Sequence, residues 1–139
     1  MRLHRAPRAH EARRGTAAVE FALVAPFLCF AFVATIDFAR VFYASLTVSN
    51  CARNGAIYGV VDKSHALDTS GIETAARMDA SNLDASQLAV SSTTDGSSYL
   101  AVRVTYPFRT LVTYPGIPHT TNLSRTVRMN VVPATPTFQ

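Results

Sequence analysis

The distribution of apolar residues sets one segment of the chain apart from the rest. Residues 16–36 form a run of twenty-one positions with a single charge, Glu20. As an α-helix this run is about 31 Å long, close to the hydrocarbon thickness of a bilayer. It is apolar on every side, unlike an amphipathic helix of a soluble domain. The pattern predicts a retained membrane-spanning helix. The alternative, a secretory signal peptide, is disfavoured because the run is too long and no small-x-small cleavage site follows it.

Helical periodicity continues beyond this run. Large apolar side chains recur every four residues, with two valines beside them: Phe38, Phe42 and Leu46, with Val41 and Val48. This stripe predicts packing against the outer domain, or alternatively against a partner helix. Gly55 or Gly59 is the expected end, so the helix is predicted to run from about 16 to 58.

The C-terminal half of the chain changes to a mixed pattern. A second helix is predicted around 69–82, capped by Asp68, Thr69 or Ser70. Three stretches then alternate apolar and polar residues. Their apolar positions are Leu88 and Val90; Leu100, Val102, Val104 and Tyr106; and Leu123, Val127, Met129 and Val131.

The connections between these stretches predict an antiparallel meander. Asp95-Gly96 indicates a hairpin turn, and 107–121, with three prolines and a glycine, is expected to be a loop. One face of the sheet is apolar and needs a cover, for which the extension of the first helix is the expected element. The predicted fold class is α+β: a long N-terminal transmembrane helix that continues into a small domain with a short helix and a three-strand antiparallel sheet.

The distribution of charged residues predicts the orientation of the chain in the membrane. Residues 1–15 carry five arginines and one acid, whereas residues 16–139 carry eight basic and eight acidic residues. Such an asymmetry predicts a cytoplasmic N-terminus and an extracytoplasmic position from about residue 40 onward. We therefore divide the chain into a basic leader (1–15), the transmembrane helix with its extension (16–58) and a small α+β extracytoplasmic domain (59–139).

The residues that carry chemistry elsewhere form no recognisable catalytic set here. The four histidines have no metal-ligand spacing, and His65 and His119 are expected in different loops. No Ser-His-Asp set, phosphate loop or carboxylate pair is recognisable. Cys29 and Cys51 are about 33 Å apart along one helix, so they cannot bond to each other. Cys51 is expected to be a free buried thiol, or alternatively a link between subunits. We expect no enzyme activity, cofactor, metal, nucleic acid or small-molecule substrate.

Two residues of the apolar run are unusual. A carboxylate such as Glu20 costs a few kcal/mol in hydrocarbon, so it needs either a positive partner or a solvated position among the headgroups. Pro26 has no N–H to donate, which predicts a helix kink, although such prolines are also tolerated in membrane helices.

The residues around this run resemble the class III prepilin signal. The segment Arg13-Arg14-Gly15-Thr16-Ala17-Ala18-Val19-Glu20-Phe21-Ala22-Leu23-Val24-Ala25-Pro26 has a basic leader, a glycine, four small or apolar residues, a glutamate and then an apolar helix. It is most similar to the TadE-like pseudopilins, the minor pilins of the tight-adherence (Tad/Flp) type IV pilus family. Ala52-Arg53-Asn54-Gly55-Ala56 resembles the Ala-Arg-x-Gly-Ala run that closes that family's helical region. The resemblance covers about residues 13–60.

The resemblance implies a processing site and a set of partners. A prepilin peptidase in the inner membrane would cut between Gly15 and Thr16, leaving the Thr16 ammonium one helical turn from Glu20. Glu20 and Phe21 would then take part in assembly with other pilin or pseudopilin subunits. The implied role is in pilus biogenesis, adhesion or secretion. The alternatives are a single-pass membrane-anchored binding or scaffolding module and, less favoured, a secreted domain with a long signal peptide.

Overall fold

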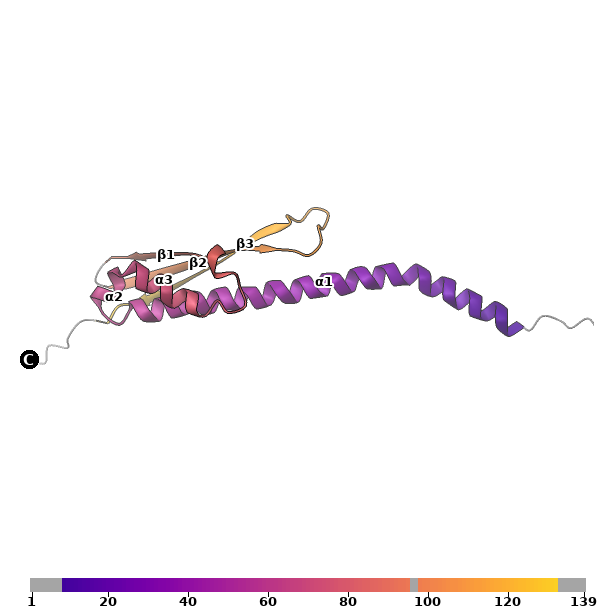
Figure 1. Ribbon diagram of the computed structural model, residues 1–139, viewed down its shortest axis with the longest axis horizontal. Helices are drawn as coiled ribbons and strands as arrows, with labels where there is room; N and C mark the ends of the chain where they lie inside the picture. Colours follow the sequence, from indigo (N-terminus) through magenta and orange to yellow (C-terminus); the bar gives the residue numbers. More distant parts are fainter. Residues whose placement is uncertain (1–8, 96–97, 133–139) are drawn as a thin grey trace, which may run out of the picture. The chain divides into compact units, whose positions relative to one another are not determined.

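The computed structural model describes residues 9–95 and 98–132, with side chains from Gly15 onward. The elements follow the predicted α+β order (Figure 1): α1 (Ala9–Gly59), α2 (Lys63–Leu67), α3 (Thr69–Met78), the 3₁₀ turn η1 (Ala85–Gln87), β1 (Ala89–Thr94), β2 (Tyr99–Arg109) and β3 (Thr120–Asn130). The chain divides into two compact units, Met1–Asp37 and Phe38–Gln139.

The first unit contains the N-terminal part of α1. Of the described residues, one helix is long and apolar enough to cross a membrane, Gly15–Gly59. Its large side chains are exposed on several sides, since Val19, Phe21 and Phe27, which point in different directions around the helix, keep 62%, 67% and 70% of their surface. No protein layer covers them among the residues that the structure describes, so the predicted membrane helix has the surface that lipid or partner helices would bury.

α1 begins seven residues earlier than predicted. Residues 9–15 of the leader already have helical backbone. The physical reason is composition, because alanine, glutamate and arginine dominate this stretch and are strong helix formers.

The second unit contains a three-stranded antiparallel sheet in the order β1-β2-β3. The register pairs Leu100 with Met129 and Val102 with Val127, which confirms the predicted apolar face. In the first connection, Asp95 Oδ1 accepts hydrogen bonds from the backbone N–H groups of Ser98 and Tyr99, at 2.8 and 3.1 Å. Gly96, the other half of the predicted turn signal, lies outside the described residues.

The loop predicted over 107–121 is shorter in the structure. β2 continues through Pro107 to Arg109, and β3 starts at Thr120. Proline is usually excluded from a central strand because it cannot donate to the ladder. Pairing between β1 and β2 reaches only Thr105, so one edge of β2 is already without a partner strand at Pro107.

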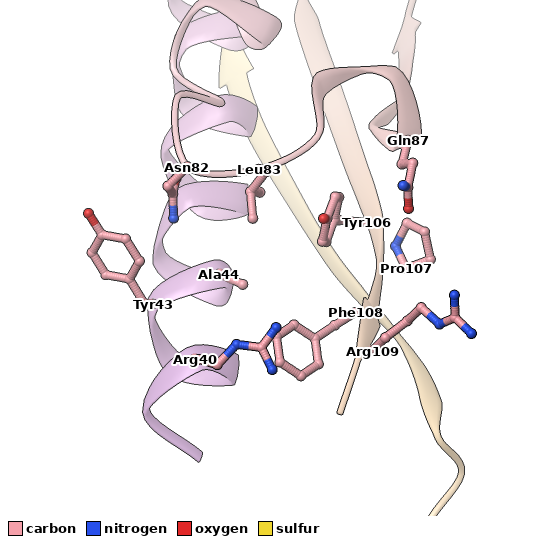
Figure 2. A pocket seen from close by; sticks show the side chains of 10 residues that line it. All are labelled: Arg40, Tyr43, Ala44, Asn82, Leu83, Gln87, Tyr106, Pro107, Phe108 and Arg109. Atoms are coloured by element: carbon pink, nitrogen blue, oxygen red, sulfur yellow. The ribbon is translucent and has the colours of Figure 1, made fainter. Parts of the chain in front are cut away.

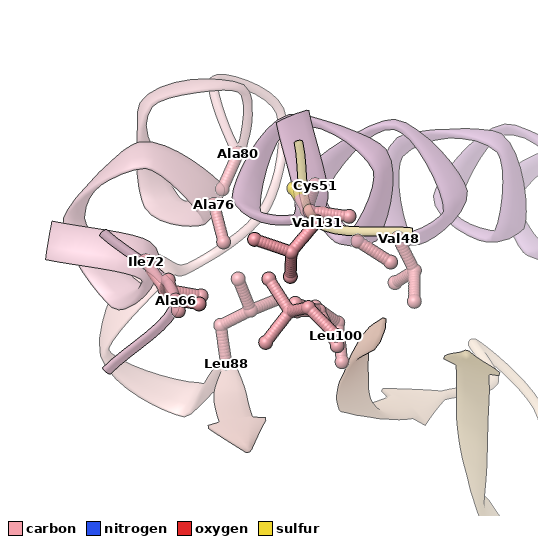
Figure 3. Close-up of a cluster of buried hydrophobic side chains, with 13 residues drawn as sticks. Val48, Cys51, Ala66, Ile72, Ala76, Ala80, Leu88, Leu100 and Val131 are labelled. Carbon is pink, nitrogen blue, oxygen red and sulfur yellow. The ribbon is translucent and has the colours of Figure 1, made fainter. Parts of the chain in front are cut away.

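The extension of α1 covers the apolar face of the sheet, as predicted. Thirteen buried apolar residues from α1, the short helices and the strands form one core cluster, part of which is labelled in Figure 3. Val48 and Cys51 of α1 and Leu100 of β2 all belong to this cluster, and all three are fully buried. Leu88, at the start of the first strand, is also buried in this cluster.

The predicted packing of the Phe38 stripe on the domain is wrong. Phe38, Phe42 and Leu46 remain 76%, 61% and 48% exposed. The sheet instead lies on a neighbouring side of α1 formed by small residues: Ala44, Val48, Cys51, Ala52, Gly55, Ala56 and Gly59. Small side chains let the helix and the sheet approach closely, whereas a row of phenylalanines would hold them apart.

Gly59 is the tightest point of this contact. A Cβ at Gly59 would overlap the Leu100 side chain and lie 3.0 Å from Ile72 Cδ1. Gly59→Ala should therefore destabilise the domain by about 1–3 kcal/mol, although alanine is the better helix former. Thermal unfolding of the full chain in detergent measures this. Asn50→Ala, at an exposed position of the same helix, is the control and should be neutral or slightly stabilising. If the two variants melt alike, the close approach at Gly59 is wrong.

Aspartates begin the short helices. Asp62, Asp68 and Asp84 each accept a hydrogen bond from a backbone N–H two or three residues on. Hydroxyl groups of neighbouring serines also donate to these carboxylates, and together the bonds lower the pKa of all three. Asp68 was one of the predicted caps.

The short helices differ from the prediction in two details. α2 was not predicted, and it places His65 in a helix rather than in a loop. α3 ends at Met78 rather than near 82, where Asp79, Ser81 and Asn82 disfavour a further turn.

Candidate processing and assembly site

Gly15 and Thr16 lie inside α1, and both are exposed. A Cβ at Gly15 would meet nothing within 4 Å, so a larger side chain would fit there without a clash. The backbone at Gly15 is helical, because α1 runs through this position. Cleavage here would require the first turns of α1 to unwind, and glycine weakens a helix locally by about 1 kcal/mol relative to alanine.

Glu20 is exposed on α1, four residues after Thr16. Residues four apart in a helix are neighbours on one side, with Cβ atoms about 6 Å apart. The geometry thus allows the ammonium that cleavage would create at Thr16 to approach the Glu20 carboxylate, within one chain or from an adjacent one. Phe21 beside it is 67% exposed and offers an apolar contact next to the charge.

Pro26 lies inside α1, which continues for more than thirty residues beyond it. Its missing N–H leaves the carbonyl of Ala22 without the usual intrahelical partner. Figure 1 shows α1 bending within the part that belongs to the first unit. The kink at Pro26 itself stays a prediction.

A groove in the second unit brings together residues that the sequence did not connect. It has a volume of about 280 Å³ and lies between α1, the 82–87 segment and the end of β2 (Figure 2). The Arg40 guanidinium lies over the Phe108 ring, 5.2 Å from its centroid. The lining of the groove also includes Arg109 and the amides of Asn82 and Gln87.

The guanidinium and amide groups of this groove can form hydrogen bonds with a ligand, but they do not form a catalytic arrangement. The lining contains no carboxylate, serine, cysteine or histidine. In the part of the chain that the structure describes, no three His, Cys, Asp or Glu side chains lie together as potential metal ligands. Sequence reasoning missed the groove because its walls come from three separate segments, of which the first and the last are more than sixty residues apart.

Cys51 is buried in the core, as predicted, and forms no disulfide within the described chain. It is fully buried, and burial raises the pKa of its thiol, with the negative charge of Asp79 adding to the effect. A raised pKa lowers the thiolate fraction and hence the reactivity of the group. A disulfide between subunits would require the core to open.

Comparison with known proteins identifies the first part of the chain. Residues 15–56 match the family model described as TadE-like protein. Over this segment the chain is similar to TadE-like proteins. No curated protein and no solved structure matches it.

The TadE-like match lies entirely within α1. It starts at Gly15 and ends at Ala56, in the last turns of α1. It therefore contains the candidate processing residue, the membrane helix and nearly all of the small-residue side that carries the sheet. The strands lie outside the match. TadE-like proteins form a structural family, so the match gives no support to an enzyme activity.

Proposed function

We propose that this chain is a TadE-like minor pilin of a tight-adherence pilus, cut by a prepilin peptidase after Gly15. It is anchored in the cytoplasmic membrane by α1, with a cytoplasmic N-terminus and the domain from Phe38 onward outside. Its role is in pilus biogenesis, and through the pilus in adhesion or secretion. The observation that carries the proposal is the family match, which begins at the exposed Gly15 and includes Glu20 five residues later.

The exposed surface of α1 supports an assembly role. Large apolar side chains remain uncovered in the membrane segment and also beyond it, at Phe38, Phe42 and Leu46. Lipid can bury the side chains of the membrane segment, but Phe38, Phe42 and Leu46 lie outside the predicted span. An apolar stripe of this kind on an uncovered helix side is typical of a contact with another helix. Other pilin or pseudopilin subunits are the partners that we propose for it.

A single-pass binding or scaffolding module is the second candidate. The observation that favours it is the groove at Arg40, whose two arginines and two amides suit an acidic or polar partner. The N-terminal residue of the membrane-extracted protein separates the candidates. Thr16 supports the pilin, Met1 supports the permanently anchored module, and a start beyond Thr35 supports a secreted domain.

Gly15→Val tests the processing step. A branched side chain at the cut should block the peptidase and leave the precursor about 1.8 kDa heavier, which is the mass of residues 1–15. Gel mobility after co-expression with the peptidase measures this. Ala22→Val introduces the same side chain at another exposed position of α1 and should be processed normally. Wild-type mobility of Gly15→Val would refute the assignment of the cut.

A further inference from the structure

The connection between β2 and β3 has an unusual surface for an exposed loop. Residues 110–118 read Thr-Leu-Val-Thr-Tyr-Pro-Gly-Ile-Pro and contain no charged residue. Leu111, Val112 and Ile117 expose 58%, 41% and 55% of their surface. Loops that face water are normally polar, so an uncharged loop with exposed large apolar side chains indicates contact with an apolar medium or partner.

Contacts along α1 show at which end of the domain this loop lies. Leu100, near the start of β2, packs at Gly59, and a Cβ at Gly55 would lie 3.3 Å from Val102 Cγ1. Further along the strand, Phe108 lies at Arg40. β2 therefore runs antiparallel to α1, back towards the residues with which the domain begins. The loop follows directly and projects from that end of the sheet (Figure 1).

That end of the domain carries the residues through which the chain leaves the apolar run. The domain unit begins at Phe38, two residues after the apolar run 16–36 that we assign to the bilayer. With a rise of 1.5 Å per residue, Arg40 is only about 6 Å along the helix from the last residue of the run. A loop that continues past the level of Arg40 therefore lies at the end of the domain where the chain enters from the apolar run.

We propose that the tip of this loop, residues 111–118, inserts into the outer interface of the bilayer and forms a second membrane contact of the domain. This inference rests on the membrane anchoring in the proposed function, not on the pilus role. Val112 and Ile117 enter the apolar side of the interface. Arg40 and Arg109 flank the base of the loop, where guanidinium groups can bind lipid phosphates.

The backbone of the loop suits such an environment. The Thr110 N–H donates to the His119 carbonyl at 3.1 Å, and the Ile117 N–H donates to the Tyr114 carbonyl at 3.2 Å. The latter closes a turn with Pro115 followed by Gly116, whose φ of 81° is the conformation that a type II turn requires of its third residue. Internal hydrogen bonds reduce the cost of moving backbone groups from water into the interface.

The absence of tryptophan from this chain permits a direct test. Ile117→Trp places a single fluorophore at the tip, and Val112→Trp places a second, independent one. The full chain is reconstituted into vesicles of phosphatidylglycerol and brominated phosphatidylcholine, because bromine quenches only tryptophan that reaches the acyl chains. Phe32→Trp, within the apolar run, is the positive reference. Thr93→Trp, on exposed β1 close to the opposite end of β2, is the negative reference.

The expected result is strong quenching at Ile117→Trp and Val112→Trp, approaching that at Phe32→Trp, with none at Thr93→Trp. Quenching at Phe32→Trp without quenching at either tip variant overturns the insertion of the loop and leaves the membrane anchor intact. Blue-shifted emission of a tip tryptophan without bromine quenching also overturns the insertion of the loop. In that case protein, for example a second copy of the chain, covers the loop. Lack of quenching at Phe32→Trp contradicts the membrane anchor of the proposed function itself.

Discussion

Glu20→Gln should remove the protein from assembled pili while leaving it processed and inserted in the membrane. If the Glu20 carboxylate pairs in low dielectric with the Thr16 ammonium of a neighbouring subunit, the neutral amide leaves that ammonium without its partner. A loss of about 3 kcal/mol weakens association by more than a hundredfold. Insertion should be normal or improved, because an amide is cheaper than a carboxylate in hydrocarbon. Cross-linking of assemblies, with membrane fractionation and N-terminal sequencing, measures the three properties separately.

The matched control is Glu73→Gln, which makes the same change on α3. Glu73 pairs with Arg77 at 2.7 Å and is far along the chain from the membrane segment. This variant should assemble like the wild type, because a partly exposed pair on one helix contributes little. Wild-type incorporation of Glu20→Gln would reduce Glu20 to a solvated residue among the headgroups, and the pilin proposal would then rest on Gly15 and the family match.

Removal of the whole of α1 should abolish folding of the remaining chain. In a fragment of residues 60–139 the apolar face of the sheet loses its cover, and with it the burial of Leu100, Val102 and Val104, which are fully buried in the intact domain. Full burial of three such side chains contributes about 5–9 kcal/mol. That is comparable to the whole free energy of unfolding of a small domain, about 5–15 kcal/mol.

The matched fragment is 38–139, which keeps the covering part of α1 and corresponds to the second compact unit. It should unfold in one cooperative thermal transition, whereas 60–139 should show none and should aggregate. Circular dichroism and size-exclusion chromatography of the two fragments measure the difference. A monomeric, cooperatively folded 60–139 would show that the sheet does not depend on α1.

The residues of the candidate processing site could be predicted from sequence because they form a local motif. Gly15, Glu20 and Pro26 are recognisable from their spacing within a dozen positions before and inside the apolar run. The groove at Arg40 could not be found in this way. Phe108 is 68 positions further along the chain and reaches Arg40 only through the antiparallel course of β2 along α1.

The sequence by itself determined the long apolar helix, the three strands and the apolar face of the sheet. Each of these depends on the periodicity of apolar residues along one segment, so it is visible without knowledge of the fold. The alternation at Leu100, Val102 and Val104, for example, already specified which side of β2 is buried.

Only the tertiary structure decided which side of α1 the sheet occupies. The apolar stripe of Phe38, Phe42 and Leu46 and the adjacent small-residue side are both compatible with packing when the helix is considered alone. The sheet takes the small-residue side because its backbone can approach at Gly55 and Gly59, where a Cβ would already be tight or would collide. By hydrophobicity alone the stripe of Phe38, Phe42 and Leu46 would be the preferred side. The choice depends instead on how closely the surfaces of α1 and the sheet fit, and these surfaces exist only when both elements are folded.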